Sequence, residues 1–508
     1  IFLEQSKTYG KADRDPGYRC LSVAHYALIR LQDYDKELVE SHGAYWYTLK
    51  ELPKLALDHD LMVQDALDKL RRKARHQPIG FELLPEKFTI PQLQKLYEAI
   101  YQRELDPRNF RKKALSLKVL VKLDEKDKSG SKRGAFLYRF DAEKYEPTYS
   151  KSAVANLPEL AKAKVDKAVA EMEQKGYQFQ KKPAGLNNVY SMGHKDVTAI
   201  YEHRGVPKYR DKFKEAHTIF LTNLKGGVAK TVSSVTLAHG LRCTPALLHH
   251  DLRILVLDLD PQASATMFMK HDLSIGVVDE TVAQAMLQNV SREELLEEFV
   301  KPTNVSGVDI IPASIEDAFI ASQFEKLASE HLPGQNIYDV LQENIIDKLK
   351  HDYDFIFIDS GPHLDAFLLN SFVAADTFLI PVPPAQVDFH STLKFMQRLP
   401  ELFDMTETAG SEIKLNSIFG YMAKIARKSD HADAQSLLRE VCGADMLDTS
   451  LPLSTAFERC GESFGTVFST NPKFYPGDRD ALKKARLRAE EFTRSVFDTI
   501  TFNRKNKG

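Results

Sequence analysis

The sequence lacks the features that mark several specialised classes of protein. Its four cysteines are widely scattered, and no two of them have the C-x-x-C spacing of zinc or redox motifs. It has no run of about 18 apolar residues and no charged-then-apolar leader, which argues against membrane spanning and secretion. The formal net charge of −2 restricts any nucleic-acid surface to a local patch. These absences predict a cytoplasmic protein with reduced thiols.

What is present is an ordinary globular composition in a long chain. With 508 residues, 43% of them hydrophobic and 28% charged, the chain is too long for one core and predicts about three or four domains. No internal repeat or low-complexity tract is visible. Ile1 leads straight into strand-like sequence, as in a chain cut from a longer one.

From about residue 217 onward, short apolar strands alternate with helices. This alternation predicts an α/β fold with a parallel sheet covered by helices on both faces. The expected strands are residues 218–222, 252–257, 308–311, 355–358, 377–381 and 417–421.

The loop after the first of these strands is rich in glycine and leads into a helix expected at 232–241. A loop in this position points backbone N–H groups and a positive helix end at one spot, which suits phosphate. Lys230 would reach the β- and γ-phosphates of a nucleotide, and Thr231 would bind Mg²⁺. The literal G-x-x-x-x-G-K-[ST] pattern fails at Leu224 and Ala229, so a generic glycine-rich turn is the alternative. The predicted nucleotide-binding residues are Gly226, Gly227, Val228, Ala229, Lys230, Thr231 and Val232.

Two other strands end in carboxylates. Residues 254–258 lead to Asp258 and Asp260, and residues 355–358 lead to Asp359. Ligands of α/β sheets bind at the carboxyl ends of the strands. We expect Asp359 to hold the Mg²⁺ shell and Asp260 to hold Mg²⁺ and orient the attacking water. Each carboxylate alone could be a strand-end cap, but the three elements in this order favour a nucleotide site.

The order of these motifs resembles the ParA/MinD class of deviant Walker ATPases. Within that class, residues 147–508 are similar to the type Ia plasmid partition ATPases. The resemblance rests on the loop 225–231, on Asp258–Gln262 and on residues 201–210, 286–298, 331–335 and 457–463. It implies that Lys225 is the signature lysine, which reaches the phosphates of the partner subunit in an ATP-sandwich homodimer. Ala229 departs from the glycine usual in the family.

The resemblance also implies a function. ATP-bound dimers would coat the nucleoid without sequence preference, and a ParB-type protein on the plasmid centromere would stimulate slow hydrolysis. The ADP form would bind its own operator through residues 147–212 and repress transcription. Arg459 corresponds to the arginine needed for non-specific DNA binding. We therefore expect ATP, ADP and Mg²⁺ as ligands, and DNA, a ParB-type protein and a second copy as partners, at the nucleoid and without a membrane.

The basic residues around two helix–turn–helix patterns are further candidates for DNA binding. Residues 163–175 read as a helix stopped by Gly176, a basic hairpin follows at 181–185, and a linker helix is expected at about 195–215. In the last helix an apolar stripe leaves Lys483, Arg486 and Arg488 outside, where they would bind phosphate in a salt-sensitive way. A solvated helix face is the alternative. The candidates from 147 onward are Lys162, Lys164, Lys181, Lys182, Arg459, Lys483 and Arg486.

Residues 1–146 resemble the later half of a Nudix-like domain followed by the winged helix of Nudix-related transcription regulators. The matching segments are 13–16, 51–53, 58–59 and 85–89. We expect a buried strand at 21–29, helices from 58, 91 and 107, and strands at 117–123 and 135–140. The Nudix box would precede Ile1, so hydrolase activity is not expected. The resemblance places Asn109, Arg111, Lys112 and Lys113 on the recognition helix and Lys132 and Arg133 at the wing; a basic solvated loop is the alternative.

We therefore predict four segments, with a joining of two unrelated proteins near Glu146. They are a truncated Nudix-like α+β segment (1–75), a winged helix (76–146), a winged helix–turn–helix with its linker (147–212) and a P-loop ATPase domain (213–508). Half a Nudix sheet would expose an edge, and the dimerising N-terminal helix of type Ia proteins is replaced here.

Other functions remain open at this stage. The chain could act chiefly as a transcription regulator whose N-terminal winged helix sets the operator. A MinD-like membrane cycler is disfavoured because residues 501–508 have little apolar surface. Residues 292–298 echo a Nudix carboxylate helix but read as a solvated face, and Cys243 and Cys442 lack the motif of an iron–sulfur reductase.

Overall fold

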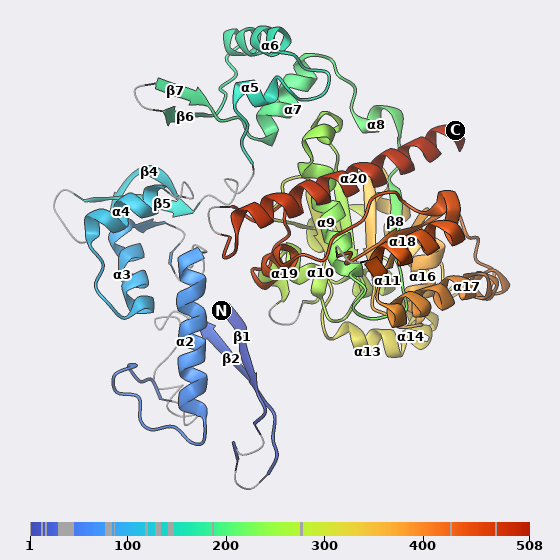
Figure 1. The fold of residues 1–508 in the computed structure, drawn as a ribbon, viewed down its shortest axis with the longest axis horizontal. Helices are drawn as coiled ribbons and strands as arrows, with labels where there is room; N and C mark the ends of the chain where they lie inside the picture. Colours follow the sequence, from blue (N-terminus) through green and yellow to red (C-terminus); the bar gives the residue numbers. More distant parts are fainter. Residues whose placement is uncertain are drawn as a thin grey trace. The chain divides into compact units, whose positions relative to one another are not determined.

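The computed structural model describes residues 2–11, 14–15, 18–28, 45–76, 84–85, 87–116, 120–127, 134–140, 147–184, 187–274, 278–426, 429–472 and 475–507. The chain forms two compact units, residues 1–144 and 145–508 (Figure 1). Lys132 and Arg133 lie outside the described residues, as does the side chain of Lys113.

The first unit begins with an antiparallel ribbon and a helix. Strand β1 (Phe2–Tyr9) pairs with β2 (Ser22–Leu28), and α2 (His59–His76) packs against them. Arg14 donates two hydrogen bonds to Asp58, of 2.9 and 2.7 Å, which fasten the ribbon to the start of α2. The predicted strand is confirmed, but its predicted burial is wrong. Leu21 and Val23 are 78% and 50% exposed, and exposed residues alternate with half-buried ones along β2.

A winged helix completes this unit. Its elements are β3 (Phe88–Thr89), α3 (Ile90–Tyr101), α4 (Pro107–Ser116), β4 (Leu120–Asp127) and β5 (Ala135–Phe140), with the sheet order β3-β5-β4. Thr89 and Gln92 form a capping box at the start of α3. We expected β4 to end before the charged stretch at Asp124, but it runs on to Asp127. The ammonium groups of Lys122 and Lys126 lie over the Phe136 ring, at 3.5 and 4.5 Å, and so pack two charged residues of this strand against β5.

The second unit begins with another winged helix–turn–helix, comprising α5 (Lys151–Val154), α6 (Lys162–Gln174), β6 (Lys181–Ala184), β7 (Asn187–Tyr190) and α7 (His194–His203). Gly176, with φ of 90°, ends α6 as predicted. The single linker helix expected at 195–215 is wrong. The chain leaves α7 at Gly205, which has φ of 67°, and forms a separate short helix α8 (Tyr209–Lys212) after Pro207.

The rest of the second unit is built on a seven-stranded sheet in the order β10-β11-β9-β12-β8-β13-β14. All neighbours are parallel except β10 and β11. The predicted α/β fold with a parallel sheet is therefore confirmed. The strands are β8 (His217–Leu221), β9 (Ile254–Asp258), β10 (Lys301–Pro302), β11 (Val308–Ile311), β12 (Phe355–Asp359), β13 (Thr377–Val382) and β14 (Ser417–Met422).

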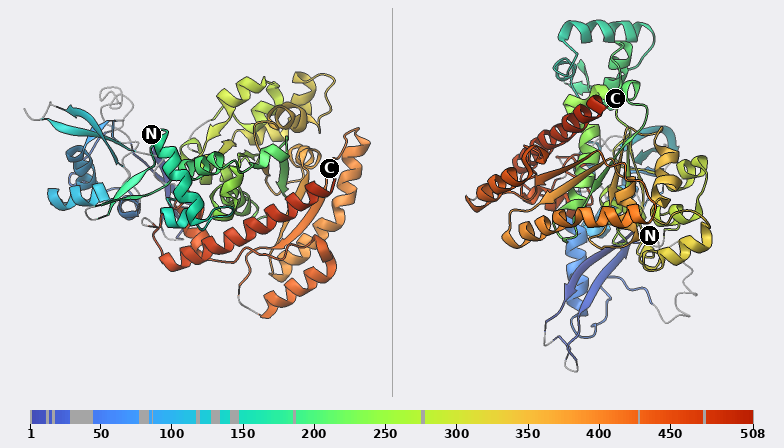
Figure 2. Two further views of the ribbon diagram at one scale, coloured as in Figure 1. Left: turned by 90° about the horizontal axis from the view of Figure 1, so that it is seen from above. Right: turned by 90° about the vertical axis from the view of Figure 1, so that its right-hand side faces the viewer.

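Helices cover both faces of this sheet (Figures 1 and 2). Those on and around it are α9 (Lys230–Cys243), η3 (Pro245–His250), α10 (Ser264–Met269), η4 (His271–Ser274), α11 (Val282–Gln288), α12 (Arg292–Glu294), η5 (Leu295–Phe299), α13 (Asp317–Ser322), α14 (Phe324–His331), η6 (Gln342–Ile346), α15 (Asp347–Leu349), α16 (Ala366–Ala374), α17 (Gln386–Thr408), α18 (Ser429–Cys442), η7 (Gly443–Asp445), α19 (Thr455–Glu462) and α20 (Arg479–Lys507). The four glutamates within residues 292–298 are exposed, which confirms the solvated face predicted there.

Alternate residues of the central strands enter two different cores. Phe220, Leu255 and Ile358 belong to the core under α11, α14, α16 and α17, whereas Ile219, Val256 and Phe357 belong to the core under α9, α10 and α20. This two-sided burial explains why the strands are apolar at every position. It leaves the carboxyl ends of the strands as the place where polar side chains collect.

Helices α9 and α20 cross at very short range. A Cβ atom on Gly240 would come within 2.3 Å of the Thr493 hydroxyl, so only glycine fits at the crossing. The inward stripe predicted for α20 is confirmed, because Leu482, Ala485, Ala489 and Phe492 are all buried.

His239, one residue before this crossing, makes the stability of the second unit pH-dependent. It is fully buried, its Nδ1 bonds the Thr466 hydroxyl at 2.9 Å, and burial lowers its pKa to about 3. In the unfolded chain it protonates near pH 6.5. Between these values the unfolded state binds the extra proton, so stability falls as pH drops from about 6.5 toward 3.

We expect His239→Asn to weaken the pH dependence of the free energy of unfolding in this acidic range. In urea unfolding between pH 6 and 4, the slope should decrease by up to about 1.4 kcal/mol per pH unit, the value for one proton. The exposed His331→Asn is the matched control and should keep the wild-type slope. Equal slopes in all three proteins would contradict the prediction.

Candidate nucleotide and DNA sites

The glycine-rich loop lies between β8 and the start of α9, at the carboxyl edge of the sheet. Asn223, which is buried, fixes its first turn: the amide nitrogen donates to the Pro381 carbonyl (3.1 Å) and the Thr392 hydroxyl (2.8 Å), and the amide oxygen accepts from the backbone N–H of Lys225 (2.9 Å). Gly226 and Gly227 are exposed, and Gly227 has φ of 75°. The loop therefore keeps a fixed backbone with an open rim.

Ala229 adopts the left-handed backbone that its place in the loop requires. It caps α9 with φ of 75° and ψ of 27° and makes no side-chain hydrogen bond. For a residue with a Cβ, this conformation costs roughly 1–2 kcal/mol. The alanine that departs from the family's glycine is thus accommodated with backbone strain.

Three carboxylates meet the loop. Asp359 ends β12 and pairs in register with Leu221 of β8 on one side and Asp258 of β9 on the other. Asp258 accepts hydrogen bonds from the backbone (2.8 Å) and hydroxyl (2.7 Å) of Thr266, so it braces the turn into α10. Asp260 is partly exposed and lies beside the backbone of Gly361. The three predicted carboxylates are thus brought together, with Asp258 in a structural position.

The Asp359 carboxylate is the least satisfied group of the site. It is fully buried, and neither oxygen has a hydrogen-bond partner among the described residues. Burial and the neighbouring Asp258 charge raise its pKa well above the usual range, although the nearby Thr231 hydroxyl opposes that rise. Burial also raises the pKa of Asp258 to about 7. An acidic pair of this kind suits a divalent cation, and one or two carboxylates with a hydroxyl and phosphates form the usual Mg²⁺ shell in such sites.

Lys230 folds back over its own loop. Its ammonium donates to the carbonyls of Asn223 (2.9 Å) and Lys225 (3.4 Å). Burial lowers the pKa of Lys230, while Asp359 and Asp260 oppose that shift. The side chain therefore lies inside the cradle that it is expected to share with phosphate.

Two residues of this region escaped the sequence reasoning. Lys424, just after β14, donates to the Gly227 carbonyl at 2.6 Å and has φ of 56°. Asp388, in the first turn of α17, pairs with the Lys225 ammonium at 3.6 Å. Both follow strands of the parallel sheet, so the rule that located Asp260 and Asp359 would also have found them.

The candidate DNA-binding residues lie on five separate elements. On α4 of the first unit, Arg111 and Lys112 are exposed. In the second unit, Lys162 and Lys164 are exposed at the start of α6, and Lys182 is exposed on β6. Lys181, also on β6, forms an ion pair of 2.8 Å with Glu173 and lies over the Tyr190 ring. It stabilises the wing as well as adding charge to it.

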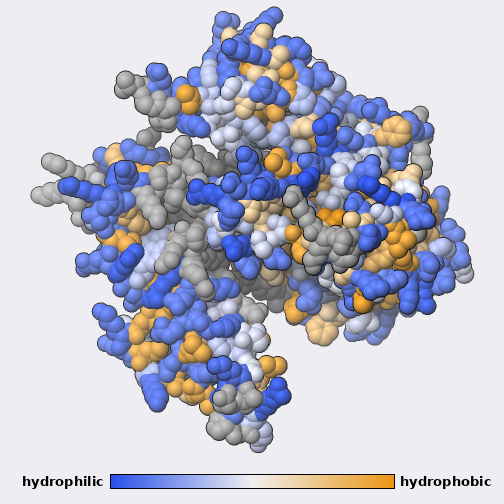
Figure 3. Space-filling view, in the orientation of Figure 1, coloured by the Kyte–Doolittle hydropathy of each residue, from blue (hydrophilic) through white to orange (hydrophobic). Residues whose placement is uncertain are grey.

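Helices α19 and α20 carry the remaining candidates. Arg459 is exposed on α19 and lies against Gly477, where an added Cβ would come within 2.6 Å of its guanidinium. Lys483 and Arg488 are exposed on α20, whose N-terminal part is hydrophilic on the face drawn in Figure 3. Arg486 is not free as predicted. Its guanidinium donates to the carbonyls of Val467 and Thr470, both at 2.9 Å, and so holds the preceding loop on α20.

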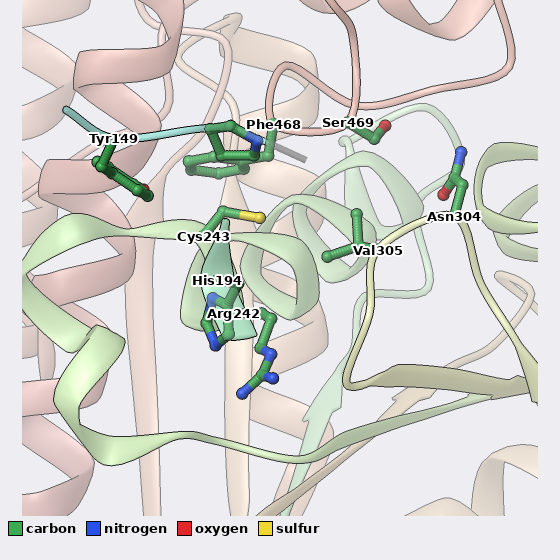
Figure 4. A pocket seen from close by; sticks show the side chains of 9 residues that line it. Tyr149, His194, Arg242, Cys243, Asn304, Val305, Phe468 and Ser469 are labelled. Carbon is green, nitrogen blue, oxygen red and sulfur yellow. The ribbon is translucent and has the colours of Figure 1, made fainter. Parts of the chain in front are cut away.

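A junction joins the helix–turn–helix to the ATPase part of the second unit. Asp251 accepts from Arg242, at the far end of α9, at 2.7 Å and pairs with Lys208 at 2.9 Å. A small pocket beside it is lined by Tyr149 and His194 from one part and Arg242 and Phe468 from the other (Figure 4). One helix thus runs from the glycine-rich loop to this junction.

Comparison with known proteins matches each part of this architecture. Residues 80–140 match the NrtR DNA-binding winged helix domain, 136–213 the ParA helix–turn–helix domain, and 216–409 an AAA domain. Plasmid partition protein A of Escherichia coli is 59% identical over 365 residues, which cover 72% of this chain and 92% of that protein. The chain belongs to the plasmid partition protein A family. The predicted membership in the ParA class of P-loop ATPases is therefore confirmed.

A solved structure described as a partition protein agrees with this assignment. It matches with a TM-score of 0.59 and 49% identity, over 71% of this chain and 89% of that one. The ADPR responsive transcriptional repressor NtrR of Acinetobacter baylyi is 34% identical over 147 residues, or 28% of this chain. The match spans 58% of that repressor's length. The resemblance predicted for the N-terminal part is confirmed as well.

Two further expectations can be compared with the described part of the chain. None of its helices has the length and apolar character needed to cross a bilayer. Within the same residues, no three His, Cys, Asp or Glu side chains are placed to hold a metal ion by themselves; this holds for Asp258, Asp260 and Asp359 as well as for Cys243 and Cys442.

We expect Ala229→Gly to stabilise this partition protein. Glycine adopts the left-handed conformation without the Cβ clash, so urea unfolding should show a gain of about 1 kcal/mol. Ala170→Gly, on the exposed side of α6, is the control and should lose about as much, because its helical backbone gains freedom only in the unfolded chain. A loss in both variants would show that Ala229 is unstrained.

Proposed function

We propose that this chain is a Mg²⁺-dependent ATPase whose ATP-bound homodimer binds nucleoid DNA without sequence preference and segregates a plasmid. The observation that carries this proposal is the buried Asp359 carboxylate. It has no hydrogen-bond partner among the described residues, and it lies near Thr231 at the start of α9 and beside Lys230. Membership in the plasmid partition protein A family supplies the biological setting.

Each group of the site has a role in this proposal. The residues from Gly226 to Val232 would hold the nucleotide, with the phosphates at the positive end of α9. Thr231, Asp359 and Asp260 would hold Mg²⁺, which neutralises charge on the phosphates. Asp260 is partly exposed and accepts a backbone bond from Gln262 (3.0 Å), which leaves carboxylate capacity to orient a water for attack. Lys230 would leave its two loop carbonyls and bond the β- and γ-phosphates.

Lys225 is proposed to act on the second subunit. Its side chain is partly exposed at the rim of the loop, whereas that of Lys230 is buried within it. A lysine at the rim can reach phosphates across an interface, as the family resemblance implies. A ParB-type protein on the plasmid centromere would stimulate hydrolysis, and the ADP form would bind the operator through residues 147–212.

Replacing Lys230 tests the chemistry. We expect Lys230→Ala to lose ATP binding and to reduce turnover at least about 100-fold, because it removes charge stabilisation at the transferred phosphate. Fluorescent-nucleotide titration and phosphate release measure the two effects. Lys326→Ala, on the exposed side of α14, is the control and should behave as wild type. Unchanged binding and turnover in Lys230→Ala would refute the mechanism.

A second function is favoured by the N-terminal unit. Its winged helix matches the NrtR DNA-binding winged helix domain, and Arg111 and Lys112 are exposed on α4. The chain would then act chiefly as a transcription regulator, with the first unit setting the operator and nucleotide setting its state.

Salt titration of DNA binding by the full chain separates these functions. Lys483→Ala should lower the slope of log affinity against log salt by about 1 on non-specific DNA with ATP, because it removes one phosphate contact. The double variant Arg111→Ala, Lys112→Ala should keep this slope. If only the double variant abolishes DNA binding, with or without ATP, the role as a transcription regulator is favoured. The proposed role in plasmid segregation is then refuted.

A further inference from the structure

The Lys225 side chain is held in its own subunit by a closed ring of four residues. Its ammonium lies 3.6 Å from the Asp388 carboxylate. The Asp388 carbonyl accepts from the Thr392 hydroxyl (2.9 Å), which accepts from the Asn223 amide (2.8 Å). The Asn223 oxygen closes the ring by accepting the Lys225 N–H at 2.9 Å.

The buried and exposed parts of this ring differ in strength. Asn223 and Thr392 are buried, so their hydrogen bonds fix the loop against α17. The Lys225 and Asp388 side chains are 41% and 32% exposed. An ion pair this exposed shifts an equilibrium only a few-fold. It is strong enough to bias the direction of Lys225 and weak enough to be broken by a competing polyanion.

The surface around the pair is open. Val387, next to Asp388, is 72% exposed, and Leu364, in the loop after β12, is 54% exposed. Large apolar side chains thus remain in solvent at the carboxyl edge of the sheet, the edge where the glycine-rich loop lies. A second copy of this chain, bringing its own nucleotide, is the occupant that would bury them.

We propose that Asp388 is a positioning residue that keeps Lys225 turned toward its own subunit until a second copy supplies a nucleotide phosphate. This inference rests on the proposed function, since it assumes that Lys225 acts across the dimer. Dimerisation must then break the Lys225–Asp388 pair, and the pair raises the protein concentration at which dimers form. Asn223 and Thr392 act through Asp388 by fixing where α17 begins.

The resting geometry can be tested without nucleotide. Amine acetylation with an N-hydroxysuccinimide ester, followed by mass spectrometry, reports the reactivity of the Lys225 amine. We expect Asp388→Asn to speed acetylation of Lys225 about two- to fivefold, the range of an exposed pair. Asp388→Glu, which keeps the charge, should restore the slow rate, and Asp404→Asn, on the exposed side of the same helix, should leave it unchanged. Equal acetylation rates in the wild type and the three variants would show that the Lys225–Asp388 pair does not restrain the Lys225 amine, which would overturn the proposal.

Dimerisation tests the consequence. With a non-hydrolysable ATP analogue and Mg²⁺, sedimentation should show a two- to fivefold lower dimer dissociation constant for Asp388→Asn than for wild type. The difference should vanish near 1 M salt, where exposed charges are screened. An unchanged or weaker dimer would overturn the proposal. Lys225→Ala in the same assay distinguishes failure of the proposed cross-subunit role of Lys225 from failure of the proposed role of Asp388. If it dimerises like wild type, the cross-subunit role of Lys225 fails, whereas the acetylation result stands independently.

Discussion

The nucleotide site depends on two buried carboxylates that lie next to each other at the carboxyl edge of the sheet. Because β8, β9 and β12 are neighbouring parallel strands, Asp258, Asp359 and the glycine-rich loop are forced together. The Asp258 carboxylate is satisfied by Thr266, but the buried Asp359 carboxylate has no hydrogen-bond partner in the described part of the chain. A lone buried carboxylate is costly unless it is protonated or meets a cation. The fold thus buries a carboxylate that a cation would stabilise, and a Mg²⁺–nucleotide complex can supply that cation.

Three lysines surround the glycine-rich loop, and each is paired with an oxygen of the protein. Lys230 and Lys424 bind loop carbonyls, and Lys225 binds a carboxylate on α17. Each of these cations therefore already has a partner within the protein. The loop backbone is held by Asn223 instead, whose bonds do not involve charge. The support of the loop backbone is thus separate from the lysines around it.

Much of this arrangement follows from the sequence because it is local or periodic. Apolar strands ending in aspartate identified Asp260 and Asp359, and a loop between strand and helix identified Lys230. Contacts that join distant segments were less accessible. A helical pattern placed Arg486 on the outer side of α20, but not its bonds to the carbonyls of Val467 and Thr470. In the same way, the sequence pattern predicted one linker helix that continued past Gly205. In the structure the helix ends just before this residue, because the backbone of Gly205 is left-handed.

The close crossing of α9 and α20 has a mechanical consequence. A Cβ on Gly240 would clash with the Thr493 hydroxyl and the Phe468 ring, so the two helices touch most closely at this point. Arg479, where α20 begins, is 14 residues from Thr493, or about 21 Å along a helix. A tilt of about 10° around Thr493 would move that end by about 4 Å, using the same rise per residue. Because Arg486 bonds the carbonyls of Val467 and Thr470, such a displacement would carry the loop before α20 with it.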